Sequence, residues 1–308
     1  MPLLVEAAIP DLDIVTWADA ERQFVDEWLL NHRAILFRGF EIDSTRRLEE
    51  FAAATSIGPL MDCPDESTPR AALADRIYES TVYPSHQSIH LHNEASYCSS
   101  WPRKIYFCCL QPARERGATP LADVRRVTAR IDADVIERFD RLGVAYARNF
   151  NTDRIGLTWQ QAFWTDDPAA VEEYCRRHDI QFQWKASGGL RTTTVRPAFR
   201  RHPISGESLW FNHAVFFHLA SYSPEMRESL IAAVGRDGLP YETSFGDGSP
   251  IEPEIVDSFL RAFEEEKMTF PWQRGDVLLL DNMTIAHGRE PYEGERSIIV
   301  AMTEAQAG

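Results

Sequence analysis

The chain has 308 residues, of which 44% are apolar, so it can bury a large core as one big β domain or as two smaller ones. Its net charge of −15 opposes binding to nucleic acid or to an anionic membrane, because phosphate-bearing surfaces attract basic proteins. No run of about 18 apolar residues and no basic-then-apolar N-terminus is present. The sequence therefore predicts neither a membrane span nor a signal peptide, and a cytoplasmic protein is expected.

In chain order, the sequence begins with a helical pattern and continues mainly as short strands. Apolar residues recur at helical spacing up to Leu29, and Thr16 with Asp19 forms a capping-box pattern that predicts where this first helix begins. Further helices are predicted at 44–55 and 131–143, and after Asp167-Pro168, Ser223-Pro224 and Glu252-Pro253. Strands are predicted at 34–37, 76–81, 88–94, 104–110, 117–123 (a turn and a short strand), 144–150, 180–184, 190–196, 208–212, 276–280 and 296–303, with a break at Trp101-Pro102.

Many short strands separated by glycine and proline turns, with few helices, predict a mainly β fold with flanking helices. Its core is expected to be an antiparallel barrel or jelly roll, that is, a cupin-like double-stranded β-helix. No composition shift or internal repeat marks a boundary, so we expect one domain over 1–308. The irregular segment at about 151–275 is expected to be a long insert between strands, either a lid over the barrel or a packed structural element.

The segment 88–94 (Ser-Ile-His-Leu-His-Asn-Glu) alternates polar and apolar residues, as in a strand with one buried face. Residues two apart on a strand share a face, so His92 and Glu94 are expected to project together and to bind a divalent metal. His287 is the best candidate for a third ligand, and we expect it and Glu94 to come from opposite ends of the barrel. Two histidines and one carboxylate are typical of non-haem Fe(II) oxygenases, because they leave one face of the metal open.

Other interpretations of these residues stay open. A His-x-acid triplet occurs about once by chance in a chain of this composition, so 88–94 also fits a solvated strand face. A cupin-like metal isomerase or dioxygenase that does not use 2-oxoglutarate could employ His90 and His92, although Glu94 follows them sooner than cupin spacing requires. A jelly-roll binding module without a metal is the non-enzymatic alternative.

The five cysteines stand at positions 63, 98, 108, 109 and 175 and lack C-x-x-C spacing. Reduced, buried thiols are therefore expected. Cys98 follows Glu94 closely, and an inert core thiol is its expected role.

Several motifs together resemble one known family. They are 91–97 (Leu-His-Asn-Glu-Ala-Ser-Tyr), 101–104 (Trp-Pro-Arg-Lys), 117–123 (Gly-Ala-Thr-Pro-Leu-Ala-Asp), 287–289 (His-Gly-Arg) and 294–296 (Gly-Glu-Arg). The combination resembles the taurine dioxygenase/clavaminate synthase-like family of Fe(II)- and 2-oxoglutarate-dependent oxygenases. Within it, the chain is most similar to the branch that contains amino-acid hydroxylases of nonribosomal-peptide clusters. The likeness spans about residues 30–303.

The resemblance implies an enzyme with Fe(II) as its metal and with 2-oxoglutarate and O2 as co-substrates. Its iron ligands would be His92, Glu94 and His287. Thr119 and Arg296 match the residues that bind the distal carboxylate of 2-oxoglutarate, in agreement with the bidentate grip of a guanidinium on a carboxylate. Arg289 is the alternative to Arg296, although a salt bridge in a turn is its expected role.

The resemblance also bears on the substrate. Taurine-type relatives carry an additional arginine where this chain has Val300-Ala301, and halogenating relatives lack a carboxylate ligand such as Glu94. We therefore expect hydroxylation, desaturation or cyclisation of an unactivated C–H bond of an amino acid, free or tethered to a carrier protein, in natural-product biosynthesis. Carrier docking would need a basic patch, such as Arg125-Arg126-Arg130 or Arg200-Arg201. Candidate substrate-binding residues are Tyr97, Arg191, Asn212 and His213.

Overall fold

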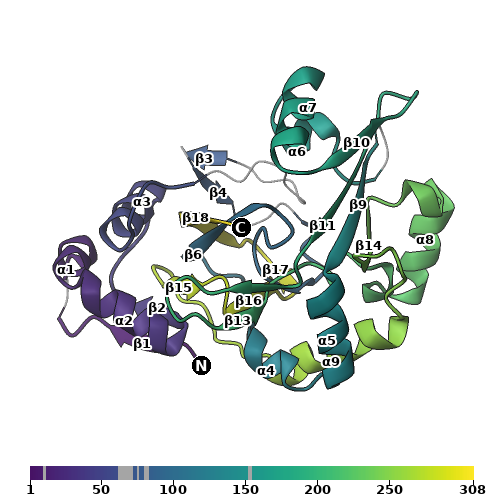
Figure 1. Ribbon diagram of the computed structural model, residues 1–308. Coiled ribbons are helices and arrows are strands. Elements are labelled where there is room, and N and C mark those ends of the chain that lie inside the picture. Colours follow the sequence, from purple (N-terminus) through teal and green to yellow (C-terminus); the bar gives the residue numbers. More distant parts are fainter. Residues whose placement is uncertain (10–11, 62–71, 75, 80–82, 152–154) are drawn as a thin grey trace.

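A seven-stranded sheet is the largest element of the fold (Figure 1). The computed structural model describes all residues except 10–11, 62–71, 75, 80–82 and 152–154. The sheet is antiparallel apart from the parallel pair β1–β2. In spatial order its strands are β1 (Leu3–Glu6), β2 (Ala34–Arg38), β15 (Val277–Asp281), β6 (Ser100–Gln111), β18 (Ser297–Ala307), β4 (Ile77–Glu79) and β3 (Ala72–Ala74).

The central strand β6 is buried on both faces. Ile105 and Phe107 face one apolar layer, and Tyr106 and Cys108 face the other, which explains the continuous apolar sequence. The predicted break at Trp101-Pro102 is wrong, because β6 already begins at Ser100. Proline is tolerated there because β15 pairs only with Lys104–Cys108, so β6 is an edge strand at Pro102.

Three helices cover the outer face of the seven-stranded sheet: α1 (Ile14–Ala20), α2 (Arg22–His32) and α3 (Thr45–Ala54). The single helix predicted from Thr16 is wrong, since Asp13 caps α1 and the chain breaks at Glu21. Arg22 donates to the carbonyl of Ala54, which ties the start of α2 to α3. The change of direction lets apolar residues of both α1 and α2 reach the same core layer.

A three-stranded sheet lies against the inner face of the seven-stranded sheet, with an apolar layer between them. Its order is β5 (Ile89–His92), β16 (Ile285–Arg289) and β8 (Leu121–Asp123). The predictions missed β16, because its sequence Ile-Ala-His-Gly-Arg carries glycine and lacks an alternating pattern. Gly288 is required there, since a Cβ at this position would lie 2.5 Å from the carbonyl oxygen of Ile89.

A four-stranded sheet of order β10-β11-β9-β14 packs over the face of the core that holds the candidate site described below. Its strands are β10 (Gln181–Trp184), β11 (Leu190–Arg196), β9 (Val144–Phe150) and β14 (Tyr241–Phe245). The two-stranded pairs are β12 (Phe199–Arg201) with β13 (Ser208–Trp210), and β7 (Glu115–Arg116) with β17 (Tyr292–Glu293). The strands predicted in this part of the chain are confirmed.

The remaining helices flank these sheets (Figure 1). They are α4 (Val124–Thr128), α5 (Ala133–Leu142), α6 (Trp159–Phe163), α7 (Pro168–Arg177), α8 (Pro224–Val234) and α9 (Pro253–Glu266), with 3-10 turns at Leu219–Ser221 and Arg236–Gly238. As predicted, α7, α8 and α9 begin with proline and α5 ends at Gly143. Among the described helices, none combines the length and apolar character needed to cross a membrane. The predicted mainly β architecture with flanking helices is confirmed.

Candidate metal centre

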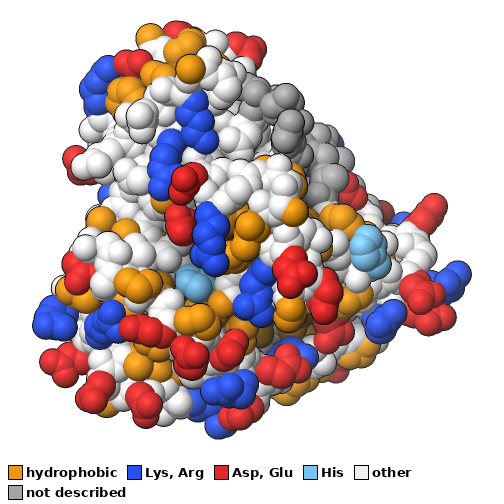
Figure 2. Space-filling view, turned by 90° about the vertical axis from the view of Figure 1, so that its right-hand side faces the viewer, with side chains coloured by type: hydrophobic (Ala, Val, Ile, Leu, Met, Phe, Trp, Pro, Cys, Tyr) orange, Lys and Arg blue, Asp and Glu red, His pale blue; other side chains and the backbone are white. Residues whose placement is uncertain are grey.

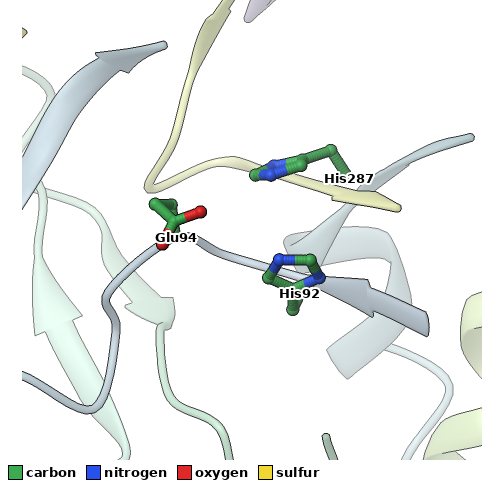
Figure 3. Close-up of side chains that lie close together, drawn as sticks. All are labelled: His92, Glu94 and His287. Atoms are coloured by element: carbon green, nitrogen blue, oxygen red, sulfur yellow. The ribbon is translucent and has the colours of Figure 1, made fainter. Parts of the chain in front are cut away.

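His92, Glu94 and His287 come together between β5 and β16. His287 lies directly opposite His92 in the antiparallel register, with the two ring centroids 4.8 Å apart. One ligand atom from each of the three side chains lies within 4.8 Å of the others, and the side chains point toward one another (Figure 3). Among the described residues, this is the one group of three such side chains. His287 thus lies on the strand beside β5, and Glu94 follows β5 in a turn, so the two residues are not at opposite ends of a barrel as predicted.

Glu94 is placed by a turn just past the end of β5. Its backbone N–H donates to the side-chain oxygen of Asn282 (2.7 Å), and its carbonyl accepts from the Asn282 amide (2.9 Å). Asn93 donates to the carbonyl of Asn282, so its side chain is held by the backbone. Ala95 has a φ of 54°, a left-handed conformation that non-glycine residues adopt rarely. These contacts fix the carboxylate of Glu94 beside His92.

The donor set suits a divalent metal that prefers mixed nitrogen and oxygen ligands. The Nδ1 atom of His92 donates to the carbonyl of His90 (2.8 Å), which leaves Nε2 with the lone pair that a metal needs. His287 is buried and packs against the ring of Phe107 (5.0 Å). His90 is not part of the group, which removes the ligand pair of the cupin-like alternative.

Two of the predicted substrate residues lie beside the metal centre. The ring of His213 is 5.7 Å from that of His92, and the ring of Tyr97 is 4.8 Å from that of His213. The Oγ atom of Ser96 lies 2.6 Å from Nδ1 of His213. Burial, followed by repulsion from His92, lowers the pKa of His213 well below its usual value, so the imidazole is neutral. Phe216, which we did not predict, lies closer still, at 4.5 Å from His92.

The other two predicted substrate residues have different surroundings. The Asn212 side chain donates to the carbonyl of Ala198 and accepts from the backbone of Ala214, so it orders the loop that carries His213. Arg191 pairs with Asn149 on the outer face of the four-stranded sheet. There it lines a groove of about 910 Å³. The structure does not bring Arg191 to the metal centre.

Thr119 and Arg296 meet next to the three-stranded sheet. Nη2 of Arg296 lies 3.5 Å from Oγ1 of Thr119, and its Nε donates to the carbonyl of Gly117 (3.0 Å). Trp272 donates to the same hydroxyl (3.1 Å). A Cβ at Gly117 would lie 2.9 Å from Cβ of Tyr292 and 3.3 Å from Cδ of Arg296, so glycine allows the close packing around this arginine. Burial first, and repulsion from Arg289 next, lower the pKa of Arg296 to about 10.

The guanidinium of Arg289 forms hydrogen bonds with the backbone. It donates to the carbonyls of Tyr83, Pro84 and Gln87, and its guanidinium lies over the rings of Tyr83 and Tyr292. The predicted salt bridge is therefore replaced by bonds to carbonyl oxygens. These bonds anchor the segment that leads into β5.

The cysteines that the structure describes are free and buried, as predicted: Cys98, Cys108, Cys109 and Cys175. Burial raises the pKa of Cys109 to about 12, so its thiol is not a nucleophile near neutral pH. Cys63 lies outside the described residues.

A jelly-roll core that presents two histidines and one carboxylate defines the class of non-haem iron oxygenases. Residues 2–303 match the family "Taurine catabolism dioxygenase TauD, TfdA family". The chain belongs to this family of Fe(II)- and 2-oxoglutarate-dependent dioxygenases, as the resemblance implied.

Two relatives and one solved structure illustrate the likeness. The dapdiamide synthesis protein DdaC of Enterobacter agglomerans is 37% identical over 91% of this chain and 84% of its own length. A clavaminate synthase-like protein of Arabidopsis thaliana is 28% identical over 92% of this chain and 84% of its own. A taurine dioxygenase from Burkholderia xenovorans superposes with a TM-score of 0.54 at 14% identity, over 98% of this chain and 86% of that one. This superposition confirms the predicted jelly-roll core.

Proposed function

We propose that this dioxygenase binds Fe(II) through His92, Glu94 and His287 and oxidises an unactivated C–H bond of an amino acid. The observation that carries the proposal is the convergence of the three ligand atoms within 4.8 Å, two from the adjacent strands β5 and β16 and one from the turn that follows β5. When bound, iron with 2-oxoglutarate and O2 supplies the oxidant for hydrogen abstraction, and 2-oxoglutarate leaves as succinate and CO2. Hydroxylation is the default outcome, and desaturation or cyclisation are variants of it.

The protein's part in this reaction is to hold and orient the side chains that would bind the metal. The carbonyl of His90 fixes the tautomer and the ring orientation of His92, and Asn282 fixes the backbone of Glu94. The rings of Phe107 and Phe216 lie against the two histidines and exclude water from their sides of the metal.

Arg296 and Thr119 are proposed to bind the distal carboxylate of 2-oxoglutarate. A guanidinium and a hydroxyl together offer three or more donors to one carboxylate. The supporting observation is that Thr119 lies two residues before β8 begins at Leu121, which is opposite His287. The arginine and the hydroxyl thus flank the strand that carries a metal ligand.

An amino-acid substrate is supported by the relatives and by the site. The 37% identical relative is named for its part in dapdiamide synthesis, which favours a role in natural-product biosynthesis. The position of the sulfonate-binding arginine of taurine-type enzymes is taken by Val300 and Ala301, which are buried in apolar layers. Tyr97 and His213 offer a hydroxyl and a neutral imidazole to polar groups of a substrate.

Docking of a carrier protein receives less support. The basic cluster at 125–130 is neutralised, since Arg125 pairs with Asp123 and Glu207, and Arg130 with Glu265 and Glu266. Arg200 is turned onto the ring of Trp101, and Arg201 donates to the carbonyl of Gly206. On the face shown in Figure 2, blue side chains lie among red ones. A free amino acid needs no basic patch and is the favoured form.

The segment 151–275 is proposed to be the insert that covers the metal centre within a single domain. It supplies His213 and Phe216, both in contact with His92. A cover of this kind keeps water from the reacting carbon.

The function is tested by measuring succinate formation with Fe(II), ascorbate and 2-oxoglutarate against a panel of amino acids, free and carrier-tethered, with taurine as comparison. We expect one or more amino acids to stimulate succinate formation and to gain one oxygen or lose two hydrogens by mass spectrometry. His92→Ala should abolish this activity, whereas His32→Ala, an exposed residue of α2, should not. Oxidation of taurine with every amino-acid form inert would contradict the proposed substrate class.

A further inference from the structure

The groove of about 910 Å³ on the outer face of the four-stranded sheet has no part in the proposed reaction. Its floor is formed by Ala145 and Ala147 of β9, which is flanked in the sheet by β11 and β14. In the strand register, Thr193 lies beside Ala147, and Ser244 lies beside Ala145. Because these side chains are small, the floor leaves room for a ligand. The volume falls within the range of about 300–1,000 Å³ that is typical of small-molecule sites.

The groove and the metal centre lie on opposite faces of the same strands. Successive side chains of a strand point to opposite faces, so Tyr146 and Thr243 point inward where the floor residues of the groove point outward. The hydroxyl of Tyr146 accepts from the backbone N–H of His213 (2.9 Å), and Oγ1 of Thr243 donates to the carbonyl of Ala214 (2.7 Å). His213 is the residue that lies beside His92. The groove is therefore a separate site and not an extension of the metal centre.

Helix α8 forms one wall of the groove, beside β9 and β14 (Figure 1). Every residue of α8 is described and none of them is buried, so the helix does not pack closely onto the sheet. Arg227 and Ile231 are one turn apart on the same face of α8, and both line the groove. Leu239 and Ile251 add apolar surface. The groove thus offers apolar contacts beside a guanidinium.

The charged side chains that line the groove differ in their exposure. Arg191 of β11 and Arg227 of α8 are half-buried, whereas Arg236, Asp179 and Glu242 are exposed. Within the described part of the chain, none of these five side chains forms an ion pair. Both half-buried charges are therefore positive, although the protein as a whole has a net charge of −15. The inner part of the groove is complementary to an anion.

Arg227 also brings an unsatisfied hydrogen-bond donor to the groove. Its Nε atom is buried, and the described residues offer it no acceptor. A buried donor without an acceptor is costly, so such an atom calls for an explanation. An oxygen atom of a bound anion would satisfy it through a charge-assisted hydrogen bond. The unsatisfied donor therefore supports the same ligand class as the charges.

We propose that the groove is a second binding site, which takes a small organic anion with an apolar body. The arginines of the groove, Arg227 above all, bind the charged group, and the apolar body lies over Ala145 and Ala147 and against Ile231. A guanidinium binds carboxylates and phosphates through the same paired N–H donors, so either group fits this chemistry. The proposal does not depend on the proposed function, because it concerns the other face of the sheet.

The test follows the fluorescence of anilinonaphthalene sulfonate, a dye that carries a sulfonate on aromatic rings. The whole enzyme is used with Mn(II) and 2-oxoglutarate, so that the candidate metal centre is filled. Octanoate, octyl phosphate, octanol and octylamine then compete with the dye, because they share one apolar body. We expect octanoate or octyl phosphate to displace the dye at concentrations on the order of 10-fold lower than octanol or octylamine. The better competitor of the two anions shows whether the groove prefers a carboxylate or a phosphate.

Substitutions in the groove locate the bound dye. Arg227→Gln should weaken the binding of dye and anion on the order of 10-fold, because a charge-assisted contact is lost. Ala147→Phe should abolish binding, because the ring fills the space above the floor. Arg176→Gln is the matched control, since Arg176 is also a helical arginine but belongs to α7 and pairs with Glu172. It should bind the dye as the wild type does. The melting temperature reports whether each variant is folded.

Three outcomes would overturn the inference. Octanol that competes as well as octanoate and octyl phosphate would show an apolar surface without recognition of an anion. Unchanged dye affinity in folded Arg227→Gln and Ala147→Phe would place the dye outside the groove. No dye binding by the wild type would mean that the groove takes no such ligand. If Ala147→Phe does not fold, Arg191→Gln replaces it, and it should weaken binding as Arg227→Gln does.

Discussion

The buried cations at the two ends of β18 differ in whether a carboxylate pairs with them. Near the C-terminal end, Glu304 pairs with Arg103 and with Lys104, and Lys104 also pairs with Asp26 at 2.6 Å. Just before the strand begins, Arg296 donates to a carbonyl and approaches a hydroxyl. Among the described residues, no acidic side chain forms an ion pair with Arg296.

This difference distinguishes a cation that is paired within the protein from the one that we propose to bind the co-substrate. Burial alone lowers the pKa of Lys104, but the phenol of Tyr106 and the carboxylate of Glu304 raise it above its usual value. The pKa of Arg296 is lowered instead, because burial and Arg289 oppose its charge and, within the described part of the chain, no carboxylate offsets them. A bound carboxylate would raise the pKa of Arg296, just as the carboxylate of Glu304 already raises the pKa of Lys104.

The largest expected effect is a loss of activity on substitution at the candidate metal centre, which lies toward the Arg296 end of β18. His287→Ala should abolish succinate formation and weaken Fe(II) binding, since one of three ligands is lost. The melting temperature should change little, because the substitution leaves the apolar layers intact. Activity equal to wild type at low iron would remove His287 from the ligand set.

A substitution of Lys104, at the other end of β18, should instead lower the stability of the fold. Lys104→Met removes the ion-pair partner of Asp26 and one of the two cations that pair with Glu304, so the free energy of unfolding should fall by about 3 kcal/mol, the lower end of the range for a broken buried pair, because Glu304 keeps Arg103. The kcat/KM of the folded protein should be unchanged. Lys267→Met is the control, because Lys267 pairs with Glu264 at the surface and contributes about 1 kcal/mol at most. Equal destabilisation by the two substitutions would contradict the structural role of Lys104.

Arg296→Ala should show the reverse profile, a loss of co-substrate affinity with little loss of stability. Removal of a charge-assisted contact to a carboxylate costs about 2–5 kcal/mol, so the half-saturating concentration of 2-oxoglutarate should rise on the order of 30-fold or more. Thr119→Val removes one neutral hydrogen bond and should cost about 1 kcal/mol. Arg114→Ala, an exposed neighbour, is the control. If the 2-oxoglutarate dependence of Arg296→Ala is normal, Arg289 becomes the candidate.

The smallest effect concerns pH. Burial raises the pKa of Glu304, but Lys104 and Arg103 outweigh burial and hold the pKa below its usual value. A carboxyl with a lowered pKa in the folded state contributes stability above its unfolded pKa of about 4.3, and this contribution is lost as the pH falls through the lowered value. Unfolding experiments should therefore show a steeper loss of stability below this pH in wild type than in Lys104→Met. Parallel curves would mean that Lys104 does not act on Glu304.

The predictions made from sequence were accurate where the pattern is local. Alternation up to His92, apolar runs such as 34–37 and proline at the start of α7, α8 and α9 depend on neighbours in the chain, although the predicted strand 88–94 ends at His92 and leaves Glu94 in a turn. The predictions failed where an element depends on a contact with a residue that is distant in the sequence. The start of α2 is tied to α3 by the bond from Arg22 to Ala54, and the length of β6 depends on its pairing with β18.

The sequence by itself determined the ligand types, the family motifs and most elements, because periodicity, caps and motif spacing are written along the chain. Only the tertiary structure decided that β16 is a strand at all, that it lies beside β5, and that His287 therefore faces His92. Burial and distance between remote segments depend on packing, which no local pattern encodes.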